Sequence, residues 1–142
     1  MKQALPIMKH LGSILEFTAA RNADLLRAFR IAVANADGHI LLPRIFAQVA
    51  DSPARRFWVS EERAAIVISA MLAGRPLPKM RRNKRDMFNE ILRRVIPLRS
   101  QSPNRSLFDI VSEVVNQPAP KFYLTPRTVG EIFYRIKSGW YD

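Results

Sequence analysis

The sequence predicts an all-α protein built from two tandem three-helix, helix-turn-helix-like units related by internal duplication. Three observations predict this fold. Apolar residues recur at helical spacing along most of the chain. The stretch from Leu41 to Gly74 aligns without a gap on the stretch from Ser106 to Gly139, at a constant offset of 65. Of the 142 residues, 48% are hydrophobic and none is cysteine, so the chain has material for a core but no disulfide framework.

The two aligned stretches share residues that helical periodicity does not require. Proline, alanine, phenylalanine and glycine recur in register, in the pairs Pro53/Pro118, Ala54/Ala119, Phe57/Phe122 and Gly74/Gly139. Amphipathic helices joined by proline turns resemble one another by chance, but chance does not keep these residues at fixed spacing. We therefore predict a duplication and divide the chain into a helical extension (1–20), a first repeat (21–74), a basic linker (75–85) and a second repeat (86–142).

Each repeat is predicted to contain three helices. Every helix is marked by an i, i+3, i+4, i+7 stripe of apolar residues, which is typical of a helix packed on one side. In the second repeat the stripes are Phe88, Ile91, Leu92 and Val95, then Leu107, Ile110, Val111 and Val114, then Val129, Ile132, Phe133 and Ile136. In the first repeat, the second and third stripes begin at Leu42 and Ala64. Apolar residues between Leu5 and Phe17 predict one more helix in the extension.

Capping residues predict where these helices begin and end. Ser106, followed by Asp109, forms a variant capping box at the start of the second helix. The third helices open on a hydroxyl residue and close on a glycine, at Ser60 and Gly74 in the first repeat and at Thr125 and Gly139 in the second. Glycine suits the end of a helix because a left-handed cap is easiest for a residue without a Cβ.

Proline-containing linkers, residues 51–59 and 116–124, join the second and third helices of each repeat. Their prolines end the second helix, and the segments also allow a short β-ribbon that pairs one repeat with the other. The aromatic pairs Phe57-Trp58 and Phe122-Tyr123 have two interpretations. They pack into the core at a helix entry, or they stack on the bases of single-stranded nucleic acid. Packing is the more common fate of such residues.

Positive charge is concentrated in one part of the chain. The sequence has 23 lysine and arginine residues against 12 aspartate and glutamate residues, a formal net charge of +11. Residues 75–105 hold ten of the basic residues and two of the acidic ones, and residues 75–85 hold six basic residues and no acidic one. Such density is typical of a segment that neutralises phosphates, although a solvated linker that keeps a protein soluble has the same composition.

The run Val114-Val115-Asn116 and the run Leu124-Thr125-Pro126-Arg127-Thr128-Val129-Gly130-Glu131-Ile132 resemble the turn and recognition helix of helix-turn-helix DNA-binding domains. In that superfamily the third helix enters the major groove, and residues near its N-terminus contact base edges. The resemblance implies that four side chains face DNA, namely Thr125, Arg127, Thr128 and Glu131. It also implies that Arg135 and Lys137 contact phosphates.

We predict that the basic residues of the linker and its flanks complete a nucleic-acid interface. These residues are Arg55, Arg56, Lys79, Arg81, Arg82, Lys84, Arg85, Arg93, Arg94 and Lys121. The third helix of the first repeat starts with Glu61 and Glu62, which repel DNA. The second repeat is therefore the better candidate for reading bases.

No catalytic residue, metal site or cofactor is expected. The sequence has no Gly-x-Ser-x-Gly elbow, no phosphate-cradling glycine loop and no His-Glu-x-x-His helix. The two histidines, His10 and His39, are expected at the surface or in a turn. The carboxylates lie at helix starts or beside basic residues rather than in a converging cluster.

Together these features predict a non-enzymatic DNA-binding protein, a regulator of transcription or replication. It would contact phosphates through the basic linker and bases through the third helix of the second repeat. Two other functions fit the same sequence: an RNA-binding module, and a helical interaction or structural protein whose charge serves solubility. No apolar stretch suits a membrane span or a secretory signal, so a cytoplasmic location is expected, for a monomer with internal pseudo-symmetry or a homodimer.

Overall fold

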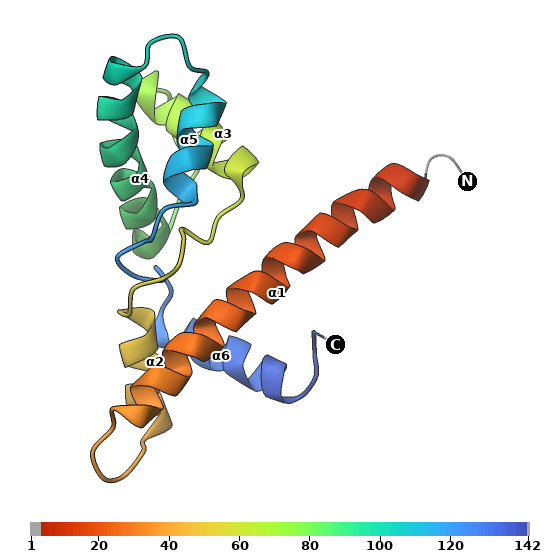
Figure 1. Ribbon diagram of the computed structural model, residues 1–142, viewed down its shortest axis with the longest axis vertical. Helices are drawn as coiled ribbons and strands as arrows, with labels where there is room; N and C mark the ends of the chain where they lie inside the picture. Colours follow the sequence, from red (N-terminus) through yellow and green to blue (C-terminus); the bar gives the residue numbers. More distant parts are fainter. Residues whose placement is uncertain (1–3, 142) are drawn as a thin grey trace. The chain divides into compact units, whose positions relative to one another are not determined.

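The computed structural model describes residues 4–141, with side chains described from Leu15 onward. These residues form the helices α1 (Ala4–Ala34), α2 (Leu42–Ala50), α3 (Glu61–Leu72), α4 (Arg82–Gln101), α5 (Leu107–Val115) and α6 (Pro126–Lys137), as Figure 1 shows. The described residues form no strand, so the all-α prediction is confirmed. Residues 1–3 of the predicted extension and Asp142 lie outside the described part of the chain.

The helices group into two compact units. Unit 1 comprises Met1–Val49 and Pro126–Asp142 and contains α1, α2 and α6, whereas unit 2 comprises Ala50–Thr125 and contains α3, α4 and α5. Each unit therefore combines two helices of one predicted repeat with the third helix of the other. The units are groups of helices in space, whereas the repeats are stretches of similar sequence, so the boundaries of the repeats stay a prediction.

Helix α1 is longer than the sequence predicted. It runs without interruption from Ala4 to Ala34, where an extension and a separate first helix were expected. No proline or glycine occurs between residues 13 and 34, so nothing in this stretch breaks the backbone hydrogen-bond ladder. The second half of α1 buries one face, which carries Leu25, Ala28 and Ala32.

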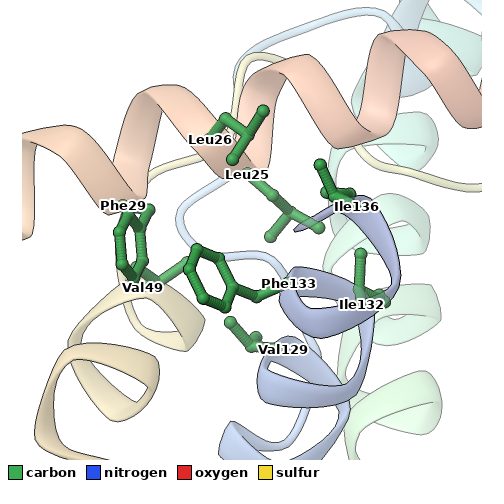
Figure 2. Close-up of a pocket in the computed structure, with 8 residues that line it drawn as sticks. All are labelled: Leu25, Leu26, Phe29, Val49, Val129, Ile132, Phe133 and Ile136. Atoms are coloured by element: carbon green, nitrogen blue, oxygen red, sulfur yellow. The ribbon is translucent and has the colours of Figure 1, made fainter. Parts of the chain in front are cut away.

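Aromatic rings from three helices hold unit 1 together. Phe29 of α1 stacks on Phe133 of α6 with ring centroids 4.4 Å apart, and Phe46 of α2 lies 5.6 Å from Phe133. Figure 2 shows Phe29 and Phe133 facing each other among the apolar side chains of α1, α2 and α6. Gly130 permits this close packing, because a Cβ there would lie 2.9 Å from two atoms of the Phe46 ring.

Unit 2 is a three-helix bundle in which α3, α4 and α5 all contact one another. Its core combines aliphatic side chains with buried aromatic rings, and its fully buried residues include members of the predicted stripes: Ile68, Ile91, Val95, Val111 and Val114. Burying such a side chain completely stabilises a protein by about 1.5–3 kcal/mol. The periodicity of the sequence thus identified the faces that meet in this core.

The predicted caps at Ser60, Ser106, Gly74 and Gly139 are confirmed, whereas the cap at Thr125 stays a prediction. The hydroxyl groups of Ser60 and Ser106 accept hydrogen bonds of 3.1 Å from the backbone N–H groups three residues later, at the starts of α3 and α5. Gly74 and Gly139 follow α3 and α6 with φ values of +67° and +77°. Each glycine N–H donates to the carbonyl three residues earlier, at 3.2 Å, as in a Schellman motif.

Unit 2 contains a single antiparallel bridge where the sequence allowed a β-ribbon. Ala54 and Ala119 exchange two backbone hydrogen bonds of 3.0 Å, but the described residues around them form no strand. Beyond the bridge, the N–H of Phe57 donates to Val115 and the N–H of Phe122 donates to Ala50, so the pairing does not continue as a regular ladder.

The backbone geometry of the two linkers repeats at the offset of the sequence alignment. Phe57 donates its N–H to the carbonyl of Val115 at 3.0 Å, and 65 positions later Phe122 donates to Ala50 at 3.3 Å, with the roles of the two linkers exchanged. The bounds of α2 and α5 also differ by 65 at both ends, as do those of α3 and α6. Internal duplication itself remains a prediction, which these correspondences support.

Each unit contains the third helix of the other predicted repeat, so the two halves of the chain should stay together when the linker between them is cut. A cut between Gly74 and Lys79 leaves α3 packed on α4 and α5 in unit 2, and α6 packed on α1 in unit 1. We expect a protein with a protease site inserted after Leu77 to elute as one species after cleavage, on size-exclusion chromatography, and to separate into two fragments in urea. Fragments that separate under native conditions would contradict this assignment of helices to units.

Candidate nucleic-acid interface

The basic segment, residues 75–85, lies wholly in unit 2, and its six lysine and arginine side chains are exposed. The chain is irregular up to Arg81 and becomes helical at Arg82, where α4 begins. Four of its side chains form no ion pair within the described part of the chain: Lys79, Arg81, Lys84 and Arg85. The segment therefore presents uncompensated positive charge to solvent.

The other two basic side chains of the segment have weak partners. Arg82 lies 3.9 Å from Asp86, and both side chains are exposed. Arg75 donates to the hydroxyl of Ser69 at 3.2 Å. Contacts of this kind at a surface contribute about 0–1 kcal/mol, so they leave both guanidinium groups available to an anion.

The start of α4 adds to the positive potential of the basic segment. The first turn of α4 contains no acidic residue, and the side chain of Arg81, the N-cap, makes no hydrogen bond to the free N–H groups. Lys84 and Arg85 thus place positive charge near the positive end of the helix dipole, which is unfavourable in the absence of an anion. A bound anion would relieve this repulsion.

Two predicted interface arginines of α4 pair with Glu90: Arg93, which is exposed, and Arg94, which is half-buried. Arg93 binds Glu90 with hydrogen bonds of 2.7 and 2.9 Å. Arg94 donates to Glu90 at 2.8 Å and to the carbonyl of Pro118 at 2.9 Å, and its guanidinium lies 4.9 Å from the centre of the Phe57 ring. Arg94 therefore ties α4 to both linkers, and this structural role accounts for its position.

The carboxylate of Glu90 joins the two arginines. The hydrogen bonds from Arg93, reinforced by those from Arg94, hold the pKa of Glu90 below its ordinary value, although burial acts in the opposite direction. The side chain of Glu90 is only 17% exposed. The folded state of unit 2 thus contains a carboxylate that is stabilised in its ionised form.

The predicted basic residues of the two linkers differ in their surroundings. Arg56 is half-buried, donates to the carbonyls of Phe57 and Val59 at 3.0 and 2.8 Å, and lies over the Trp58 ring. Burial lowers the pKa of Arg56 from its ordinary value. Lys121 is half-buried above the Tyr123 ring, at 5.5 Å, and Arg55 is exposed.

The aromatic pairs of the linkers are mostly inside unit 2. Phe57, Phe122 and Tyr123 are buried, and Tyr123 stacks on Phe57 with ring centroids 6.1 Å apart. Trp58 is half-buried. Packing, rather than stacking on bases, is therefore the role of three of these four rings.

The residues implied by the helix-turn-helix resemblance are divided between the units. Helix α5 ends at Val115 in unit 2 and α6 begins at Pro126 in unit 1, so the two helices of the expected motif do not share a compact unit. Thr125 belongs to unit 2, whereas five others belong to unit 1: Arg127, Thr128, Glu131, Arg135 and Lys137. These five and the basic segment therefore belong to different units.

Helix α6 exposes several polar side chains on unit 1. The Arg127 side chain is 90% exposed and pairs with Glu131 at 3.2 Å. The guanidinium of Arg135 lies 5.6 Å from the centre of the Trp140 ring, and Lys137 is exposed. The ion pair between Arg127 and Glu131 joins exposed residues one helical turn apart, so a polyanion can replace Glu131 as the partner of Arg127 at little cost in free energy.

Sequence analysis missed one side chain of the basic surface of unit 2. Arg63, near the start of α3, lines a groove together with Lys79, Arg81 and Lys84. Arg63 belongs to a different helix and to the other predicted repeat, and the packing of α3 beside α4 brings it to the basic segment. No sequence signal identifies that contact.

The described residues contain no group of three or more His, Cys, Asp or Glu side chains that could hold a metal ion. His39 is exposed, and the side chain of His10 lies outside the described ones. None of the described helices has both the length and the apolar character that a membrane crossing requires.

Comparison with models of known protein families, with curated proteins and with solved structures finds no match.

Acid should weaken unit 2 through Glu90. Because the folded pKa of Glu90 lies below its unfolded value, its contribution to stability is complete above the unfolded pKa of about 4.3 and is lost as the pH falls through the folded pKa. The urea midpoint of unfolding, followed by Trp58 fluorescence in a Trp140→Phe background, should fall more steeply with acid in the wild type than in Glu90→Gln. Parallel pH profiles for the two proteins would refute this role of Glu90.

Proposed function

We propose that this protein binds nucleic acid, with DNA as the expected target, and that the basic segment of unit 2 contacts the phosphates. One observation carries the proposal: four exposed cations of that segment form no ion pair within the described chain, namely Lys79, Arg81, Lys84 and Arg85. Lysine and arginine placed in this way bind phosphate oxygens through charge-assisted hydrogen bonds and release condensed counterions.

The contrast within α4 supports this proposal over a role of the charge in solubility alone. In the middle of the helix, Arg93 and Arg94 share the carboxylate of Glu90. At the start of the helix, beside the basic segment, the first turn has no acidic residue. Positive charge is thus neutralised where it packs and left open at one end of the helix, as a site for an anionic partner requires.

We further propose that α6 reads bases, as the helix-turn-helix resemblance implies, so that the protein acts as a non-enzymatic regulator of transcription or replication. Arg127 is the residue best suited to this task, because its guanidinium matches the two acceptors of guanine in the major groove. Its exposure of 90% leaves it accessible, and its pairing with Glu131 is weak. Arg135 and Lys137 would then contact phosphates.

Removing charge from the basic segment should weaken DNA binding. We expect the triple variant Lys79→Gln, Arg81→Gln, Lys84→Gln to bind a labelled duplex about tenfold or more weakly, measured by fluorescence anisotropy at low salt. The slope of log Kd against log salt should decrease by up to about 2.7, since each lost phosphate contact removes about 0.9.

A matched variant controls for net charge. Arg30→Gln, Arg44→Gln, Arg99→Gln removes three exposed cations outside the basic segment and should retain most of the affinity. Equal losses in the two variants would show that affinity follows net charge and not the basic segment. No salt-sensitive binding of any duplex would refute the proposed function, and tighter binding of a hairpin RNA than of duplex DNA would assign the surface to RNA.

The role of α6 is tested through sequence preference. Discrimination is measured between the preferred duplex and the same duplex in which another base replaces the guanine. If Arg127 reads guanine, Arg127→Ala should reduce this discrimination by about 1–3 kcal/mol, while affinity for unrelated DNA changes little. Preferred sequences are first selected from a random duplex pool with the wild type, and both proteins are then compared by anisotropy. An unchanged preference in Arg127→Ala would remove α6 from base recognition.

A further inference from the structure

A groove in unit 2 lies where the basic segment passes the start of α3 and the first turns of α4. Its volume is about 290 Å³. That size is near the lower limit of small-molecule sites, about 300–1,000 Å³, so it has room for a group as large as one base and its sugar. Its lining residues are Val59, Arg63, Pro78, Lys79, Met80, Arg81, Lys84, Met87 and Phe88.

The lining of the groove is amphipathic. Four of its residues are cationic, none is acidic, and the remaining five are apolar. Met87 and Phe88 are buried in the core of unit 2, so they form a fixed floor, whereas Val59 and Met80 are half-exposed at the walls. A ligand that matches these walls has a flat or apolar part and a negative charge at its edge.

We propose that this groove holds one unpaired nucleotide of a nucleic-acid strand, and the proposal rests on the function proposed above. The base would lie against the apolar walls, at Val59 and Met80. Its phosphate would lie at the rim, near Arg81 and Lys84. In an intact duplex the faces of the bases are covered by their stacked neighbours, so only a gap, a bulge or a single-stranded tail supplies the required surface.

The charge outside the groove favours a nucleic-acid strand as the occupant. Arg82 and Arg85 lie between groove residues in the sequence, at the start of α4, and are exposed, so a strand that leaves the groove has further cations nearby. The free N–H groups at the start of α4 add positive potential beside the same rim. A strand with one charge per nucleotide uses this continuous arrangement, whereas a single free anion would use only part of it.

The experiment compares three labelled substrates of one sequence with the full-length protein: an intact duplex, the duplex with a short single-stranded tail, and the duplex with an abasic tail of the same length. We expect the tailed duplex to bind about five- to tenfold more tightly than the intact duplex, which is the effect of one base contact. The abasic tail should lose most of this gain, because its phosphates remain but its bases are absent.

Variants of two neighbouring apolar residues locate the effect. Met80→Gln should abolish the preference for the tailed duplex, measured as the ratio of the affinities for the tailed and the intact duplex. Leu77→Gln is the matched control, because Leu77 lies in the basic segment but does not line the groove, and it should preserve the preference. Circular dichroism checks that both variants fold, and the abasic substrate tests the proposal without any variant.

The outcomes separate this inference from the proposed function. Equal binding of the tailed and intact duplexes, or full retention of the gain by the abasic tail, would overturn the nucleotide site and leave the proposed function standing. Absence of binding to all three substrates would refute both. An acidic peptide that displaces only the tail-dependent part of the binding as effectively as a single-stranded oligonucleotide would also overturn the assignment, in favour of a protein partner.

Discussion

The reciprocal hydrogen bonds between Ala54 and Ala119 are the interaction on which unit 2 depends. Both residues are buried, and a buried N–H or C=O without a partner destabilises a fold by about 1–3 kcal/mol. The bridge and the flanking bonds made by Phe57 and Phe122 satisfy these groups by holding the two linkers together. In this position both phenylalanine rings enter the core, and α3 begins where it can pack on α5.

Contacts with the joined linkers also engage some of the arginines of unit 2, whereas others remain exposed. Arg94 reaches across to the carbonyl of Pro118 and covers the Phe57 ring, and Arg56 caps the carbonyls of its own linker. Four cations of the basic segment, Lys79, Arg81, Lys84 and Arg85, form no ion pair within the described chain. Identical side-chain chemistry therefore serves structure in the linkers and in the middle of α4, and remains exposed at the start of α4.

The helices of unit 2 were largely predictable because their signals are local. Ser60 and Ser106 cap the turns that follow them, and Gly74 supplies the left-handed residue after α3, so each boundary depends on a few neighbouring residues. The length of α1 was predicted incorrectly. The sequence predicted one helix in the extension and a separate first helix in the first repeat, but the two segments form one continuous helix. The β-ribbon is reduced to one bridge, because the N–H groups of Phe57 and Phe122 donate to the ends of α5 and α2, a pairing that no local pattern specifies.

The sequence by itself determined where most helices begin and end, and that positive charge is concentrated in residues 75–105, because capping and periodicity are local and charge is additive. Only the tertiary structure decided that α3 packs with α4 and α5 while α6 joins α1 and α2. It also brought Arg63 to the groove and joined Arg94 to both linkers. The physical reason is that these contacts join residues distant in the sequence. A local apolar stripe shows which face of a helix is buried, but it does not specify which helix that face will meet.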